Sequence, residues 1–127
     1  MRIIGLGLDI VEISRLESSI SRFGDRFLDR LFAPEEREYC DRFREPARCY
    51  AARFGAKEAV SKALGTGIGR ELGWLDILIR RLPSGQPTVI LQGAGSETAS
   101  RLGVTEMFLS LSHSEHYAVA QALATGA

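Results

Sequence analysis

The chain has 127 residues, of which 45% are hydrophobic and 25% charged, proportions typical of one soluble globular domain over residues 1–127. Its 16 basic and 16 acidic residues give a net charge of zero, which argues against a nucleic-acid-binding protein. No apolar run approaches the ~20 residues that span a membrane, and the first predicted strand leaves no room for a signal peptide. Cys40 and Cys49 are expected to be reduced thiols. We therefore expect a cytoplasmic location.

The first predicted strand, residues 3–13, carries one carboxylate in an otherwise apolar run. Side chains alternate along a strand, so Gly5, Gly7 and Asp9 share one face. The glycines leave room on that face for something else to approach closely. A buried carboxylate requires a hydrogen bond, a cation or a metal, which makes Asp9 a candidate metal ligand.

Three short helices are predicted next. Ser14 and Glu17 match a capping box, which predicts a helix over residues 14–23. Residues 25–32 form a second helical segment. A third helix, over 34–43, begins with a proline followed by two glutamates, a typical first turn.

A longer helix is predicted over residues 46–64, because a proline opens it and Gly65 ends it. Alanines at every third or fourth position give it one narrow face suited to close packing. A second stripe places Glu58 one turn before Lys62. These two residues form either an exposed ion pair or, together with Asp9, a divalent-metal site beside a phosphate-binding helix. The surrounding stretch, 41–62, has six basic residues against three acidic ones, a field that suits a small polyanion.

The last part of the chain has mainly strand-like patterns. Strands are predicted over 74–82, 88–91, 107–112 and 117–124, with a helix over 93–102 between them. One strand, then helices, then mostly antiparallel strands is the order of an α+β fold.

Two further motifs are weak as signs of a site. The glycine-rich run at 65–69 follows a helix, whereas a Walker phosphate loop precedes one, so a flexible helix end explains it equally well. Ser112 and His113 are adjacent on a strand and face opposite ways, which does not suit a nucleophile and its base. His113 fits better as a hydrogen-bond donor to a phosphate or a base edge.

Four sequence blocks occur in order along the chain: GLGLDIVEISR at 5–15, RFGAKEA with KALGTGI at 53–68, SGQP at 84–87 and LSLSHS at 109–114. Together they resemble the holo-acyl-carrier-protein synthases, small phosphopantetheinyl transferases of bacterial fatty acid synthesis, over nearly the whole chain. The family usually has Lys where this chain has Gln86, which leaves that position without a charged phosphate contact.

The resemblance implies transfer of the 4′-phosphopantetheine arm of coenzyme A to a serine of apo-acyl carrier protein, releasing adenosine 3′,5′-bisphosphate. It also implies a small fold with a mainly antiparallel sheet on a long central helix. Mg²⁺, or Mn²⁺ as an alternative ion, is expected on Asp9 and Glu58. Magnesium prefers one or two carboxylates plus phosphate oxygens, so the residues and the resemblance agree.

The resemblance also assigns roles by position. Lys62 is expected to stabilise the diphosphate and the leaving bisphosphate, and Glu58, alone or through a metal-bound water, is the best candidate base for the incoming serine. The family forms homotrimers in which Asp9 of one chain meets the nucleotide-binding residues of its neighbour. The expected coenzyme contacts are Arg53 and His113 at the nucleotide half and Ser61, Lys62, Gly65 and Pro87 along the cleft.

Acyl carrier protein is acidic, which gives a reason for the arginines of the first helices. Arg15, Arg22 and Arg26, with Phe27 as an apolar anchor, are the expected docking residues, and they lie near one face if the helix continues past Gly24. An ordinary solvated helix face would look the same without the resemblance.

Two other functions fit the residues alone. A Mg²⁺-dependent hydrolase of a nucleotide diphosphate would use the same carboxylates with water as the nucleophile. A non-catalytic oligomeric binding domain would bind the coenzyme without chemistry. The sequence leaves open which carrier proteins are accepted and whether acyl-coenzyme A is used.

Overall fold

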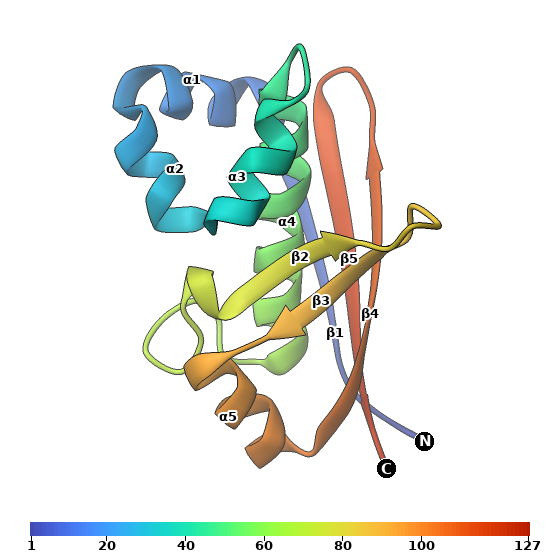
Figure 1. The fold of residues 1–127 in the computed structure, drawn as a ribbon. Coiled ribbons are helices and arrows are strands. Elements are labelled where there is room, and N and C mark those ends of the chain that lie inside the picture. Colours follow the sequence, from blue (N-terminus) through green and yellow to red (C-terminus); the bar gives the residue numbers. More distant parts are fainter.

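The computed structural model describes all 127 residues, with a long helix, α4 (Pro46–Leu64), packed on a three-stranded antiparallel sheet (Figure 1). The strands of this sheet lie in the order β1 (Arg2–Glu12), β5 (Tyr117–Gly126) and β4 (Val104–His113). The α+β class and the sheet on a long central helix are therefore confirmed. The remaining elements are α1 (Ile13–Phe23), α2 (Asp25–Leu31), α3 (Pro34–Asp41), the 3₁₀ helix η1 (Trp74–Asp76), the antiparallel hairpin of β2 (Ile77–Arg81) and β3 (Pro87–Leu91), and α5 (Gly93–Leu102).

The glycine face of β1 lies directly against α4. A Cβ atom on Gly5 would lie 1.8 Å from the carbonyl oxygen of Ala63, and one on Gly7 would lie 1.8 Å from that of Ala59. Such distances exclude any side chain, so the element that approaches the glycines closely is the backbone of α4.

Small side chains line the rest of this interface. The alanine face of α4, with Ala56 and Ala59 fully buried, packs against β5, where alternate residues from position 118 to 124 are buried alanines. The short side chains let helix and sheet approach closely. This arrangement places the face of α4 that carries Glu58 and Lys62 beside Asp9 of β1.

The predicted helix starts and ends agree with the structure at several places. Helix α4 begins and ends as predicted, and Gly65 caps it in the left-handed conformation with φ of 78°. Helix α5 also has its predicted bounds. Prolines and glycines mark these ends because of their own backbone preferences.

Two local predictions were wrong. Helix α1 begins at Ile13 with Glu12 as its N-cap, and the hydroxyl of Ser14 donates to the Glu12 carboxylate at 3.3 Å, so no capping box forms. The chain passes from β1 into α1 without a loop, which leaves Ser14 inside the first turn. The predicted strand over 74–82 is also shorter, because the backbone N–H of Gly73 donates to Asp76 and closes the 3₁₀ turn η1 first.

The cysteine prediction was also wrong. Cys40 and Cys49 form a disulfide, with Cα atoms 5.4 Å apart. Helix α3 is followed by a short turn that returns the chain along α4, and this reversal, which the spacing alone does not show, brings the two thiols together.

No helix of the structure combines the length and the apolar character needed to cross a membrane.

Candidate functional site

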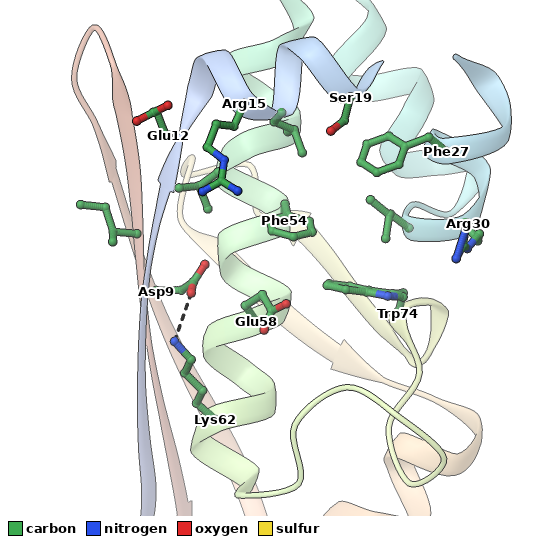
Figure 2. A pocket seen from close by; sticks show the side chains of 14 residues that line it. Asp9, Glu12, Arg15, Ser19, Phe27, Arg30, Phe54, Glu58, Lys62 and Trp74 are labelled. Carbon is green, nitrogen blue, oxygen red and sulfur yellow. Dashed lines mark hydrogen bonds and ion pairs between the residues drawn. The ribbon is translucent and has the colours of Figure 1, made fainter. Parts of the chain in front are cut away.

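A pocket of about 590 Å³ opens between β1, α1, α2 and α4 (Figure 2). Its polar end is formed by Asp9 of β1 together with Glu58 and Lys62 of α4, which are one turn apart on the same helix face. Residues far apart in the sequence therefore meet in one pocket, as the close packing of β1 on α4 requires.

Asp9 faces α4 and pairs with Lys62 in the isolated chain. Nζ of Lys62 lies 3.1 Å from Oδ1 of Asp9 and donates to the carbonyl oxygen of Leu8 at 2.9 Å. The Asp9 side chain is only 17% exposed. Gly55 of α4 lies next to it, since a Cβ there would be in ordinary contact with Oδ2 at 3.8 Å. Lys62 is thus the internal counter-ion of Asp9.

Glu58 has surroundings that disfavour its charged form. Burial and, secondarily, the negative charge of Asp9 raise the pKa of Glu58, while Lys62 opposes the shift. A bound cation would relieve both the repulsion and the desolvation. A carboxylate with a raised pKa is also a stronger base toward a hydroxyl group.

The donor set fits a magnesium ion that is completed by a substrate. No group of three or more Asp, Glu, His or Cys residues in the chain is arranged so that it could hold a metal ion by itself. Asp9 and Glu58 nevertheless line the same pocket. Mg²⁺ is commonly held by one or two carboxylates, with phosphate oxygens and waters as its other ligands.

The other end of the pocket is apolar. Phe54 and Trp74 stack with ring centroids 5.1 Å apart (Figure 2), and Phe27 and Leu31 also line the pocket. These side chains give the pocket an apolar wall near the carboxylates. Trp74 was not predicted from the sequence, because its position depends on how the loop after α4 returns to the helix.

Positively charged side chains also line this pocket. Arg15 of α1 and Arg30 of α2 both line it, together with the apolar Phe27. Arg30 was not among the predicted docking residues. Helix α1 ends at Phe23 and the following Gly24 has φ of 62°, so the condition for Arg26 to share a helix face with Arg15 is not met.

A second pocket of about 440 Å³ contains the predicted nucleotide contacts Arg53 and His113. Arg53 is 3% exposed and lies over the Tyr39 ring at 4.3 Å from its centroid. Its buried Nε atom has no hydrogen-bond partner, and burial lowers the pKa of its guanidinium. The other cations of this pocket are Arg44, Arg48 and Arg81.

These features make the second pocket a candidate anion site. An unpaired buried donor and several arginines favour a phosphate-bearing ligand, because a guanidinium matches phosphate oxygens geometrically. Arg44 and Arg48 belong to the basic stretch noted in the sequence. Arg81 lies outside that stretch, on β2, and only the folded chain brings it there.

One chain does not bring all the predicted site residues together. Arg53 is five residues before Glu58, which places the two side chains about 140° apart around the axis of α4. The two pockets share no lining residue. The carboxylate pocket and the basic pocket thus lie on different faces of the same helix.

The remaining predicted coenzyme contacts lie outside both pockets. Ser61 is buried, and its hydroxyl donates to the Glu58 carbonyl oxygen at 2.7 Å, so it is already engaged within α4. Gly65 is exposed at the end of α4, and Pro87 is half-buried at the start of β3. A single chain therefore offers Gly65 and Pro87, but not the Ser61 hydroxyl, to a ligand.

Comparison with known proteins identifies the family. The family model of the 4′-phosphopantetheinyl transferase superfamily matches residues 5–122. A holo-[acyl-carrier-protein] synthase of Koribacter versatilis is 46% identical over 121 residues, covering 95% of this chain and 97% of the relative. The chain belongs to the 4′-phosphopantetheinyl transferase superfamily.

Solved structures of this superfamily share the fold. The holo-[acyl-carrier-protein] synthase of Neisseria meningitidis superimposes with a TM-score of 0.91 at 33% identity, over 97% of this chain and 98% of that one. The Helicobacter pylori enzyme in complex with coenzyme A has a TM-score of 0.85 at 35% identity, over 94% and 99%. The resemblance found in the four sequence blocks is confirmed.

Proposed function

We propose that the chain transfers the 4′-phosphopantetheine group of coenzyme A to a serine of apo-acyl carrier protein, releasing adenosine 3′,5′-bisphosphate. The observation that carries this proposal is the meeting of Asp9 and Glu58 in one pocket of a chain from this superfamily. Support for the donor comes from the Helicobacter pylori relative, which was solved with coenzyme A bound.

The proposed metal ion is Mg²⁺, with Mn²⁺ as the alternative, and Asp9 and Glu58 would hold it. When bound, such an ion neutralises charge on a diphosphate and orients it for in-line attack. The Lys62 side chain is half exposed, so its ammonium group would then leave Asp9 and the Leu8 carbonyl and pair with the diphosphate instead. Its positive charge suits the negative charge that develops on the leaving bisphosphate.

The residues of the pocket favour transfer to a serine over hydrolysis. Glu58 is the proposed base for the serine hydroxyl, directly or through a water, and its raised pKa suits that role. Once a coenzyme and a carrier protein cover the pocket, the apolar wall of Phe54 and Trp74 would limit the water in the same space. The incoming serine is therefore the better-placed nucleophile.

We propose a homotrimer whose active sites are shared between neighbouring chains. The carboxylate pocket and the basic pocket face different sides of α4, so one chain cannot place both on a single coenzyme. The face of β1 opposite α4 is apolar and exposed at Leu6, Leu8 and Ile10, with exposures of 60%, 59% and 64%. An apolar sheet face of this kind needs cover, which neighbouring chains would supply. Gly65 and Pro87 stay proposed coenzyme contacts within that shared cleft.

Acyl carrier protein is the proposed acceptor. Arg15 and Phe27 line the carboxylate pocket, and Arg22 and Arg26 are exposed on the same pair of helices, where an acidic partner can reach them. We further propose that residues 1–127 act as one domain, and that the enzyme works in the cytoplasm with the other proteins of fatty acid synthesis. This location follows from the proposed reaction and not from the cysteines, which form a disulfide in place of the expected free thiols.

Mass spectrometry of apo-acyl carrier protein tests the proposed reaction. After incubation with the enzyme, coenzyme A and Mg²⁺, we expect a gain of ~340 Da, one phosphopantetheine linked as a phosphodiester. A chelator should abolish the gain. Unmodified carrier with free phosphopantetheine would instead show a hydrolase. Unmodified carrier and intact coenzyme A would show a binding domain without this activity.

A further inference from the structure

A buried ion pair lies directly behind the wall of the carboxylate pocket. Nζ of Lys57 lies 2.7 Å from Oε1 of Glu36, and both side chains are fully buried. Lys57 immediately precedes Glu58 in α4, so the two side chains leave the helix about 100° apart. Neither Lys57 nor Glu36 lines the pocket.

All three N–H bonds of the Lys57 ammonium are directed at fixed acceptors. Besides Glu36, the ammonium donates to the carbonyl oxygen of Leu31 at 2.7 Å and to that of Trp74 at 3.1 Å. Leu31 is the last residue of α2, and Trp74 is the first residue of η1. The side chains of both residues form part of the pocket wall.

Glu36 extends the same network to two more segments. Its Oε1 atom accepts from the backbone N–H of Ala33 at 2.9 Å, and its Oε2 atom accepts from that of Ile79 at 3.0 Å. One ion pair thus joins the end of α2, the start of α3, the middle of α4, η1 and β2. Every polar atom of the pair is satisfied, as a buried network requires.

The Lys57–Glu36 pair is better explained by a role in positioning the pocket wall than by a contribution to the stability of the fold. Buried ion pairs lose on desolvation about what they gain by attraction, and apolar side chains often replace them without loss of stability. The wall residues Leu31 and Trp74 stand at the ends of short helices, where no continuous ladder of backbone hydrogen bonds fixes them. Lys57 supplies that fixed point from the helix that carries Glu58.

We propose that the Lys57–Glu36 pair is a positioning element of the transfer reaction, which holds the Trp74 and Leu31 wall at a set distance from Glu58. This inference rests on the proposed function, because it assumes that the reaction takes place in this pocket. A misplacement of about 1 Å is enough to slow an enzymatic step by about a hundredfold. Loss of the pair is therefore expected to affect turnover more than coenzyme binding.

The test compares three variants with the unchanged enzyme. Lys57→Met combined with Glu36→Gln removes the ion pair without leaving a buried charge. Trp74→Ala removes the wall side chain but keeps the carbonyl that Lys57 binds. Tyr50→Phe is the matched control, because Tyr50 is buried on the same helix and the variant loses a partly buried hydrogen bond, to Asp41 at 2.6 Å, away from this pocket.

Two readouts are measured well below the melting temperature of each variant: kcat and KM for coenzyme A, and tryptophan emission. Trp74 is the only tryptophan, so emission reports on the wall directly. In the double variant we expect kcat to fall about ten- to a hundredfold, KM to stay within about twofold, and emission to shift to longer wavelength. Trp74→Ala should lower kcat with the ion pair intact, and Tyr50→Phe should change neither kcat nor emission.

The proposal is overturned if the folded double variant keeps its emission and kcat, or if Trp74→Ala keeps its kcat. It is also overturned if Tyr50→Phe loses kcat to the same extent, since a general loss of stability would then explain both. If the unchanged enzyme does not modify the carrier, the proposed function fails. Emission of the double variant then still decides whether the ion pair holds the wall.

Discussion

Glu58 is held where its charge is disfavoured. Burial and the neighbouring Asp9 raise the pKa of its carboxyl group, while Lys62 is engaged with Asp9. Such a group is unfavourable for stability and favourable for function, since it is ready to bind a cation or accept a proton. Asp9 and Glu58 were predicted from the sequence because carboxylates in apolar or alanine-rich stretches are conspicuous. Trp74 and Arg30 were not, because only tertiary packing places them in the pocket.

We expect Glu58→Gln to abolish transfer and to stabilise the metal-free fold at neutral pH. A carboxyl group whose pKa is raised on folding contributes stability that is complete below its unfolded pKa of about 4.3 and is lost as the pH rises through the folded pKa. Thermal unfolding should therefore show a higher Tm for the variant at pH 7–8 and converging values toward pH 4. Transfer should fall by at least about a hundredfold.

Glu97→Gln, on the exposed surface of α5, is the control for this substitution and should show no such pH-dependent difference. A lower Tm of Glu58→Gln at pH 8, with no recovery toward pH 4, would contradict the description of Glu58 as a carboxyl group whose pKa is raised by the fold.

At the level of elements, contact between the backbones of β1 and α4 builds the carboxylate pocket. The glycines of β1 and the alanines of α4 predicted close packing from sequence, and Pro46, Gly65 and Gly103 predicted helix ends, because each of these residues has its own steric preference. The disulfide and η1 were missed, since both depend on how distant or returning segments meet.

Gly7→Ala should destabilise the protein by about 1–3 kcal/mol and lower activity, because its Cβ would lie 1.8 Å from the backbone oxygen of Ala59 and would force β1 and its Asp9 away from α4. Gly69→Ala is the matched control, since nothing lies within 4 Å of that position. Denaturant unfolding measures both. Equal stability of the two variants would contradict the close packing described here.

The Cys40–Cys49 disulfide closes a short loop between α3 and α4, beside the basic pocket that Cys49 lines. By the chain-entropy model, reduction with a dithiol should lower the free energy of unfolding by about 2–3 kcal/mol. The double variant Cys40→Ser with Cys49→Ser should not respond to the reductant. Thiol titration of protein purified without reductant should find no free thiol, and two reactive thiols would contradict the bonded state.

At the level of the whole molecule, a single chain holds the carboxylate pocket and the basic pocket apart, although the proposed reaction needs both at one coenzyme. The resemblance assigned Arg53, His113, Asp9 and Glu58 to a coenzyme site shared between neighbouring chains, and within one chain the fold distributes them over two pockets on different faces of α4. The spacing along a helix gives the angle between Arg53 and Glu58, but only the resemblance indicated that neighbouring chains share a site.

Mixing two inactive variants tests this sharing. Asp9→Asn damages only the carboxylate pocket, and Arg44→Glu with Arg48→Glu, both exposed, damages only the basic pocket. Co-expressed in equal amounts, the two should recover about a quarter of the normal activity, because one interface in four then combines two intact halves. Mixtures that stay inactive, although mixed oligomers form, would contradict a shared site.

The binding of Mn²⁺, followed by electron paramagnetic resonance, tests the central claim most directly, namely that Asp9 and Glu58 together hold a divalent ion against the coenzyme diphosphate. With coenzyme A present, we predict that the unchanged enzyme binds one ion per chain, and that Asp9→Asn or Glu58→Gln each reduces the affinity at least about tenfold. Tight binding that survives both substitutions, or no coenzyme-dependent binding to the unchanged enzyme, would contradict the account.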